Sequence, residues 1–95
     1  GLLLMNEDSR PEKFNKWLTL WNHWKNWLRE NDSTPVQAAL SFALSDNRIS
    51  RVVVGVDSLN QFKDIIAVSS NIGKFPESFH ITDTRLLNPS EWHLL

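Results

Sequence analysis

Three consecutive valines, Val52 to Val54, lie in the stretch "RVVVGV" and limit what this chain can fold into more than any other feature. An unbroken run of β-branched residues predicts a strand over residues 51–56 that is buried on both faces, as strands are in parallel sheets covered by helices. A strand needs neighbours that pair with its backbone N–H and C=O groups. No second segment of the sequence is a strong strand that could supply these neighbours.

A helix rich in tryptophan is predicted over about residues 10–30. The stretch "KWLTLWNHWKNWLREN" carries four of the five tryptophans, with spacings of four, three and three. These spacings place the indoles on one broad apolar face of a helix. Ser9 as a cap, Pro11 in the first turn and Glu12 three residues after Ser9 form a start signal for this helix.

Two further helices are predicted on either side of the strand. The sequence "TPVQ" at residues 34–37 has the form of a capping box and opens a helix over about 35–45. A third helix over about 59–69 follows the strand. Residues 70–95 contain prolines and no sustained period, which predicts an irregular tail with one short helical turn near 89–92.

The fold class is therefore mainly α with one short β-strand. We expect a single segment, 1–95, in which a loop over 1–9 precedes a helix–helix–strand–helix region over 10–69 and the irregular tail over 70–95. This order is what remains when the end of an alternating α/β chain is cut out, which indicates a piece of a larger protein. The alternative is a small helical domain that pairs its strand across a dimer or buries it under the tail.

Composition excludes several functional classes. Without cysteine, the chain has no disulfide, thiolate metal site or thiol chemistry. The net charge of −1 gives no reason to expect nucleic acid as a partner, and no apolar run approaches the roughly 18 residues of a membrane-spanning helix. The three histidines lie far apart, so we expect no metal site. We read the protein as cytoplasmic, without a membrane partner.

The covering of the tryptophan face stays open at this stage. The face could pack into the chain's own core, line the rim of a substrate pocket that stacks on a sugar or ring substrate, or bind a partner. A membrane surface is a further alternative, since Lys13, Lys16, Lys25 and Arg29 lie on the opposite side of the helix. The globular pattern that follows argues against this last alternative.

The stretch "TPVQAALSFALSDNRISRVVVGVDSLNQFKDII", residues 34–66, resembles the C-terminal end of an aldo/keto reductase. The pattern is a helix with "TP-x-Q-x-AL", a strand with a glycine at its end, and "S-x-x-Q" opening the last helix. "GLLL" at residues 1–4 resembles the loop after the seventh barrel strand. "LLNPSEW" at residues 86–92 is similar to the tails of one subgroup, which includes reductases linked to surface-sugar biosynthesis. The resemblance implies the C-terminal piece of a (β/α)8 TIM barrel.

The resemblance also implies a cofactor site. In this family the loop after the eighth strand and the start of the last helix hold the adenosine end of a nicotinamide cofactor. Carried over by position, the cofactor-binding residues are Gly55, Val56, Asp57, Ser58, Gln61 and Asp64. Glycine permits close approach of the backbone, and a helix start offers free N–H groups to an anion.

The same residues have a purely local interpretation. Ser58 and Gln61 fit a capping box without any ligand, and Asp57 is a common residue before a helix. The choice between NADP and NAD also stays open. Many family members carry a cation here for the 2′-phosphate, whereas this chain has Asp57 with Lys63 as the nearby cation, and Ile65 where many have asparagine.

No catalytic residue is expected in this chain. Aldo/keto reductases use a tyrosine as general acid together with a lysine, an aspartate and a histidine from the first half of the barrel, and this chain has no tyrosine. The resemblance therefore implies a part of an NADP- or NAD-dependent reductase of small carbonyl substrates. By itself the part should be inactive, bind no cofactor tightly and self-associate. The alternative is a free-standing helical interaction module that uses the tryptophan face.

Overall fold

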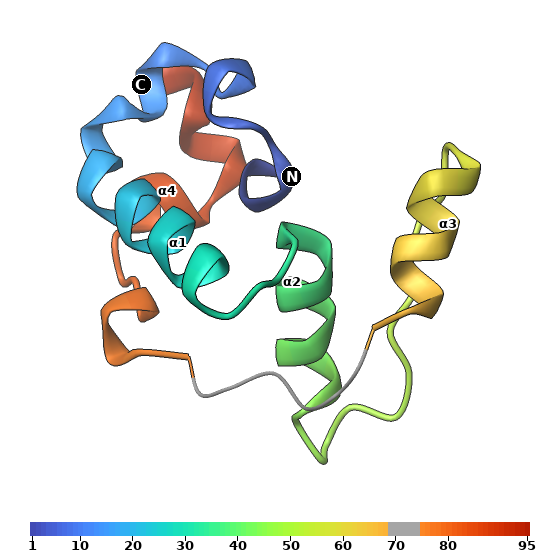
Figure 1. Ribbon diagram of the computed structural model, residues 1–95. Coiled ribbons are helices and arrows are strands. Elements are labelled where there is room, and N and C mark those ends of the chain that lie inside the picture. The colour runs from blue at the N-terminus through green and yellow to red at the C-terminus, as the bar shows by residue number, and fades with distance from the viewer. Residues whose placement is uncertain (69–74) are drawn as a thin grey trace. The chain divides into compact units, whose positions relative to one another are not determined.

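The computed structural model describes residues 1–68 and 75–95, and these residues are mainly helical, as the sequence predicts (Figure 1). The α-helices are α1 Leu18–Glu30, α2 Pro35–Leu44, α3 Leu59–Ile66 and α4 Thr84–Leu87, and the 3₁₀ turns are Leu2–Leu4, Glu7–Ser9, Glu12–Trp17, Glu77–Phe79 and Pro89–Leu94. The chain divides into two compact units. We call Gly1–Trp27 with Phe75–Leu95 the tryptophan unit, and Leu28–Lys74 the valine unit.

The first predicted helix is confirmed over most of its length, but its start differs. Residues 12–17 form 3₁₀ turns, and α-helical geometry begins at Leu18. The predicted cap at Ser9 is wrong, because Ser9 belongs to the preceding turn Glu7–Ser9, and Pro11 occupies the N-cap position without a side-chain hydrogen bond.

The core of the tryptophan unit is aromatic. Phe14 and Trp21 are buried together with Leu86 of the C-terminal segment. Further along α1, Trp24 and Trp27 lie face to face with ring centroids 6.1 Å apart. Two rings of the C-terminal segment, residues 75–95, cover them: Phe75 stacks on Trp27 at 4.6 Å, and Phe79 meets Trp24 edge-on at 5.6 Å. A third ring of this segment, Trp92, meets Phe14 edge-on at 5.1 Å. The tryptophan face is therefore core packing, covered by the chain itself.

The polar edges of the indoles are satisfied within the same unit. Trp21 Nε1–H donates to the Phe14 carbonyl at 2.8 Å, and Trp24 Nε1–H donates to the Leu3 carbonyl at 3.2 Å. Trp92 Nε1–H donates to the Leu86 carbonyl at 2.9 Å. A buried indole is stable only when its N–H finds such an acceptor. The Trp24 bond fixes how the first N-terminal turn meets α1, whereas the Trp92 bond lies within the C-terminal segment.

The C-terminal segment is more regular than predicted. Residues 77–79, 84–87 and 89–94 are helical, so the predicted irregular tail is wrong over these residues. The short helical turn predicted near 89–92 is confirmed. Two side chains cap the last two helical elements. The Asp83 side chain accepts from the Arg85 N–H, and the Asn88 side chain accepts from the Ser90 N–H. In Figure 1 this segment returns to the N-terminal turns, where Lys13 Nζ donates to the Trp92 carbonyl at 2.9 Å.

The valine unit contains the other two predicted helices. The capping box at the start of α2 is confirmed, because Thr34 Oγ1 accepts from the Gln37 N–H and the Gln37 side chain accepts from the Thr34 N–H. Helix α3 packs against α2 and ends at Ile66. The predicted end of this helix at residue 69 and the predicted start of the tail at residue 70 lie outside the described residues.

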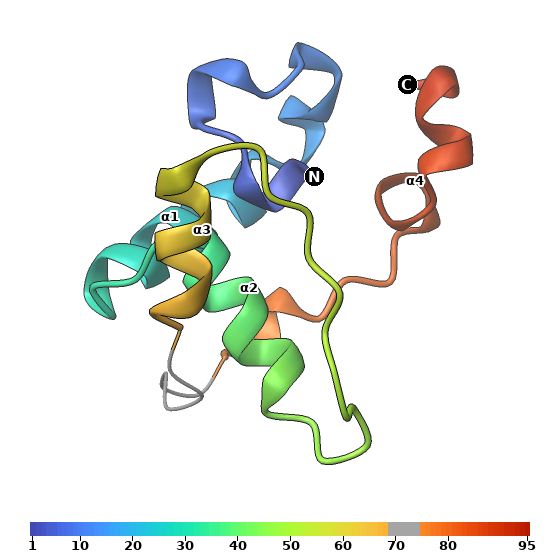
Figure 2. The same ribbon diagram turned by 90° about the vertical axis from the view of Figure 1, so that its right-hand side faces the viewer.

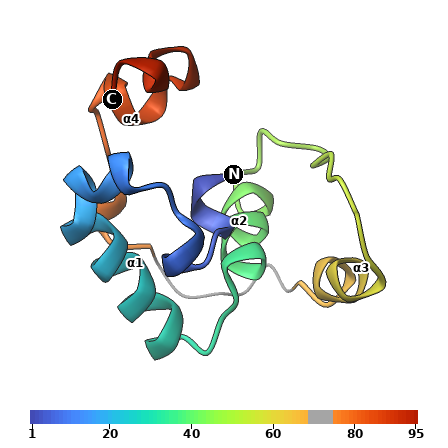
Figure 3. The ribbon, with the colours of Figure 1, turned by 90° about the horizontal axis from the view of Figure 1, so that it is seen from above.

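The predicted strand over 51–56 is not present. Residues 51–57 carry no regular structure and run as a drawn-out segment between α2 and α3, which Figures 2 and 3 show from two directions. Burial on both faces is also wrong for this chain, because the Val53 side chain is 98% exposed and Val54 is 40% exposed. The physical reason is that the described residues supply no second strand for it to pair with.

We predict that the C-terminal segment stabilises the tryptophan unit through Leu86. Leu86 is 7% exposed and its neighbour Leu87 is 57% exposed on the same helix, so the two make a matched pair. Leu86→Ala should lower the free energy of unfolding by about 2–3 kcal/mol, since it leaves a cavity beside the aromatic core. Leu87→Ala should change it by no more than about 0.5 kcal/mol.

The measurement is urea unfolding followed by tryptophan fluorescence. All five tryptophans belong to the tryptophan unit, so the signal reports on this unit alone. Equal effects of the two substitutions would contradict the described packing.

Candidate functional site

The candidate site is the loop that ends the valine run and opens α3. Of the six residues predicted to bind a cofactor, the structure joins Asp57, Ser58 and Gln61 through hydrogen bonds. Gly55, Val56 and Asp64 are exposed on the same loop and helix. The sequence thus located one continuous surface feature, and its role in cofactor binding stays a prediction.

Local hydrogen bonds shape the start of α3. Ser58 is the N-cap, and its Oγ accepts from the Gln61 N–H at 3.2 Å. The Gln61 side-chain oxygen in turn accepts from the Asp57 N–H at 2.7 Å. This is a capping arrangement shifted by one residue, because the return bond reaches the residue before the cap. The predicted Ser58 cap is therefore confirmed, whereas the predicted capping box is wrong in its return bond, which reaches Asp57 and not Ser58. Neither bond conflicts with a role in binding.

Unfilled backbone donors remain at this helix start. The first N–H groups of a helix have no partner inside it. The Gln61 N–H is satisfied by Ser58, whereas the N–H groups of Leu59 and Asn60 have no hydrogen-bond acceptor among the described residues. Such free donors, together with the positive end of the helix dipole, favour an anion. The sequence predicted free N–H groups at this helix start, and the structure assigns them to Leu59 and Asn60.

Gly55 lies in open space. A Cβ at this position would meet no atom within 4 Å, and no described glycine has a positive φ. The fold of the described chain therefore does not require glycine here. A ligand or another backbone that comes close to residue 55 would explain why glycine stands at this position.

A second polar cluster surrounds Asp83 in the tryptophan unit. Arg85 donates to both carboxylate oxygens, at 3.0 and 2.8 Å, and Trp17 Nε1–H donates to Oδ2 at 3.3 Å. Hydrogen bonding from Arg85 is the main cause that lowers the pKa of Asp83 to about 2 from its usual 3.8, with a smaller contribution from Trp17. The cluster anchors the C-terminal segment to the 3₁₀ turn Glu12–Trp17 that leads into α1, so we assign it a structural role.

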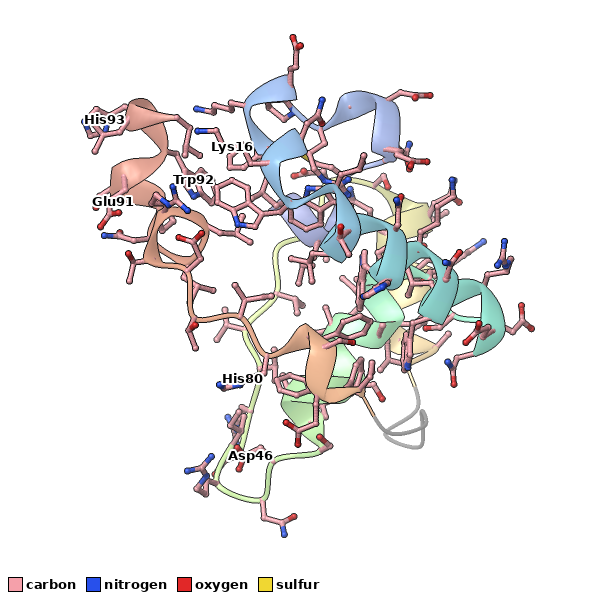
Figure 4. The ribbon with its side chains drawn as sticks, turned by 90° about the vertical axis from the view of Figure 1, so that its left-hand side faces the viewer. Lys16, Asp46, His80, Glu91, Trp92 and His93 are labelled. Carbon is pink, nitrogen blue, oxygen red and sulfur yellow. The ribbon has the colours of Figure 1, made fainter. Side chains whose placement is uncertain are left out.

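Two of the three histidines belong to the C-terminal segment. Figure 4 shows His80 and His93 at separate places along the C-terminal segment. His93 Nδ1 lies 2.7 Å from the Ser90 carbonyl, which is a local turn contact. Within residues 1–68 and 75–95, no three His, Cys, Asp or Glu side chains gather into a group that could hold a metal ion. The same residues include no helix that is long and apolar enough to cross a membrane.

A valine segment that leads through a glycine into a capped helix is typical of the strand-to-helix turns of α/β enzymes. Comparison with known families assigns the class more closely: the model of the aldo/keto reductase family matches residues 3–83. The chain therefore belongs to the aldo/keto reductase family. Searches of curated proteins and of solved structures gave no match.

We predict that Ser58 stabilises α3 as its cap. Ser58→Ala removes the acceptor of the Gln61 N–H and should destabilise α3 by about 1 kcal/mol. Ser50→Ala, at an exposed position before the valine run, is the control and should have no effect on α3. Amide hydrogen exchange in residues 61–66 measures the difference, and unchanged exchange in the Ser58 variant would contradict the cap.

We also predict a pH dependence of the Trp17–Asp83 contact. Because the folded-state pKa of Asp83 is depressed to about 2, its carboxylate keeps its contacts above the usual pKa of 3.8 and loses them as pH falls through about 2. The Trp17 indole N–H resonance should stay constant from pH 7 to 4 and then shift as the pH approaches 2. The Trp24 indole donates to a carbonyl and is the internal control. A Trp17 shift with its midpoint at pH 4 or above would contradict the assignment.

Proposed function

We propose that this chain is the C-terminal part of a nicotinamide-dependent aldo/keto reductase and that it contributes the adenosine end of the cofactor site. The proposal joins the family membership to one structural observation. That observation is the contrast between the units: the tryptophan unit has an aromatic core, whereas the buried residues of the described valine unit are Ala38 and Ser41.

The exposed apolar side chains support a larger parent protein. In the valine unit these are Phe42, Leu44, Ile49, Val53, Val54, Val56, Leu59, Phe62 and Ile66. Moving such a side chain from full exposure to full burial is worth about 1.5–3 kcal/mol, and less where it is already half-covered, so a sequence that places nine of them in one unit is expected to bury them. In a (β/α)8 barrel the valine run would be a strand between two others, with helices outside and packed side chains inside.

The loop before α3 fits an anionic cofactor. The free N–H groups of Leu59 and Asn60 suit a phosphate oxygen, and the open space at Gly55 lets a ligand approach the backbone. Because the oxygen of the Gln61 side chain is already bonded to the Asp57 N–H, its amino end is the part that would meet an acceptor on adenine. Asp64 lies one turn along the helix and would accept from the adenine amino group. The bound cofactor would supply the hydride.

The choice between NADP and NAD depends on the charges at this loop. A 2′-phosphate is favoured by cations and disfavoured by a carboxylate. Asp57 begins the loop and Lys63 lies in the middle of α3, so the two charges oppose each other. Either cofactor is compatible with this arrangement.

Catalysis requires residues beyond this chain. Reduction of a carbonyl needs a proton donor beside the nicotinamide, and the donor used in this family is a tyrosine, of which the chain has none. We therefore propose that the small carbonyl substrate is reduced by the intact parent protein. Trp17 and Trp92 are the half-buried tryptophans, and they are the rings left to line a substrate-pocket rim.

The alternative, an interaction module that binds through the tryptophan face, has less support. Trp21, Trp24 and Trp27 are between 4% and 8% exposed, because the chain's own C-terminal segment covers them. A partner would have to displace that segment before it reached the face.

Calorimetry with NADPH and NADH tests the proposal. The 95-residue chain should bind neither with micromolar affinity, because it holds only the adenosine end of the site. Two missing charge-assisted contacts cost about 3–6 kcal/mol, or roughly two to four orders of magnitude in affinity. Micromolar binding by the chain alone would contradict a partial site.

The intact parent protein of this proposal provides the second test, in which binding is expected. There, Asp64→Ala should weaken cofactor binding by roughly tenfold or more, the loss of one hydrogen bond to a charged group. Asp8→Ala makes the same substitution at an exposed position in the tryptophan unit and should leave the affinity unchanged. Equal affinities for both variants would contradict the proposed role of Asp64.

A further inference from the structure

Arg10 brings a charged group to the aromatic core of the tryptophan unit. It directly follows residues 1–9, which we call the N-terminal loop. The Arg10 guanidinium lies over the ring of Trp21, 4.2 Å from the ring centroid, and Trp21 is 4% exposed. Arg10 Nη2 donates to the Met5 carbonyl across a long 3.5 Å, and Nε is buried without a hydrogen-bond partner among the described residues. Burial lowers the pKa of Arg10, and the charge of Glu7 acts in the opposite direction.

The position of this guanidinium needs an explanation. A buried N–H without an acceptor costs free energy, and a methionine could fill the same space without that cost. The compensating gain is the attraction of a cation to the face of an indole, which is strongest where water is excluded. Because Arg10 contacts the Trp21 ring and also donates to the backbone at Met5, it joins the N-terminal loop to α1. An apolar side chain could not make both contacts.

Two other contacts attach the N-terminal loop to α1, and both are expected to be weaker. Trp24 Nε1–H donates to the Leu3 carbonyl at 3.2 Å, which is a bond between neutral groups. Glu7 Oε2 lies 2.6 Å from Lys25 Nζ, but the two side chains are 50% and 62% exposed, so water screens their attraction. Of these three contacts, the one made by Arg10 has its charge shielded from water. We therefore expect Arg10 to decide how firmly the loop is held.

The attachment leaves the side chains of the N-terminal loop available. The bonds reach the backbone carbonyls of Leu3 and Met5, whereas the side chains of Leu3, Leu4 and Met5 are 45%, 48% and 40% exposed. In the proposed barrel the valine run is a strand, and α1 and α2 precede it. Because helices follow strands in such a barrel, the N-terminal loop would connect the preceding strand to α1. Loops of this kind form the end of the barrel that binds ligands.

We propose that Arg10 is a positioning residue of the intact reductase. Stacked on Trp21, it holds the N-terminal loop so that Leu3, Leu4 and Met5 contact the apolar part of the carbonyl substrate. Arg10 itself touches neither the substrate nor the cofactor and acts through the loop. This inference rests on the proposed function, and it adds a determinant of substrate affinity that lies outside the proposed cofactor loop.

Hydrogen exchange of the indole N–H groups tests the attachment in the 95-residue chain. Arg10→Met keeps the aliphatic part of the side chain and removes the cation, so the Trp24 N–H, which is bonded to the loop, should exchange roughly five- to thirtyfold faster. The Trp92 N–H is bonded to the Leu86 carbonyl and should keep its rate, which makes it the internal control. Arg29→Met makes the same substitution at an exposed position of α1 and should change neither rate.

A conservative variant separates the cation from the size of the side chain. Arg10→Lys keeps a cation that can reach the ring of Trp21 but loses the planar guanidinium, so its Trp24 N–H should exchange at an intermediate rate. Two outcomes would overturn the proposal. One is a Trp24 N–H that exchanges as slowly in Arg10→Met as in the unchanged chain. The other is equal acceleration at Trp24 and Trp92, because Arg10 would then stabilise the whole unit and not the loop.

Steady-state kinetics of the intact parent protein test the consequence for the substrate. Arg10→Met should raise the KM for the carbonyl substrate at least about threefold and change kcat by less than about twofold, because the loop would contact the substrate away from the reacting atoms. Arg29→Met should change neither constant. An unchanged KM in Arg10→Met would overturn this inference and leave the proposed function standing. A parent protein that reduces no carbonyl compound with NADPH or NADH would overturn the proposed function, and this inference with it.

Discussion

The packing of aromatic rings from the C-terminal segment onto the tryptophan helix is the interaction that the tryptophan unit depends on. Phe75, Phe79 and Trp92 each contact a ring of the helix region, and Leu86 closes the core beside Phe14. Each indole brings a large apolar area together with one N–H that needs an acceptor. Because two of the acceptors, the Leu3 carbonyl and the Asp83 carboxylate, lie far along the chain from their tryptophans, apolar burial and hydrogen bonding select the same arrangement.

The valine unit presents the opposite case. Its sequence has the apolar content of a core, but its largest side chains are exposed and its valine segment has no strand beside it. A helix satisfies its backbone by itself, so α2 and α3 form from their caps and local pattern. A strand depends on residues elsewhere, so the valine run stays unpaired. The same physical difference explains why the unit keeps its helices without forming a core of its own.

Local signals made the helices and their caps predictable. The covering of the tryptophan face and the state of the valine run depend on contacts between distant residues. The Thr34–Gln37 box and the Ser58 cap could be read from a few adjacent residues. The tryptophan spacing predicted the apolar face, but nothing in the helix itself indicated that Phe75 and Phe79 would cover it. The valine run was predicted to be a strand because its apolar pattern is typical of a strand buried between neighbours. The described chain supplies no such neighbours. For the candidate site, the sequence located the loop and predicted free N–H groups at the helix start, while the structure was needed to assign them to Leu59 and Asn60.

The exposure of the valine run and the incompleteness of the cofactor site have one cause under the proposed function. As a strand inside the parent barrel, the run would have neighbours on both edges, and its backbone N–H and C=O groups would be paired. The loop that follows, from Gly55 to Ser58, would then be held at the carboxyl end of the strand, where barrels of this kind bind their ligands. In this chain the loop keeps its hydrogen bonds to α3, but no described residue pairs its backbone with the segment that leads into it. β-branched residues suit a strand only when such neighbours are present, so the same residues that are exposed here would be buried in the barrel.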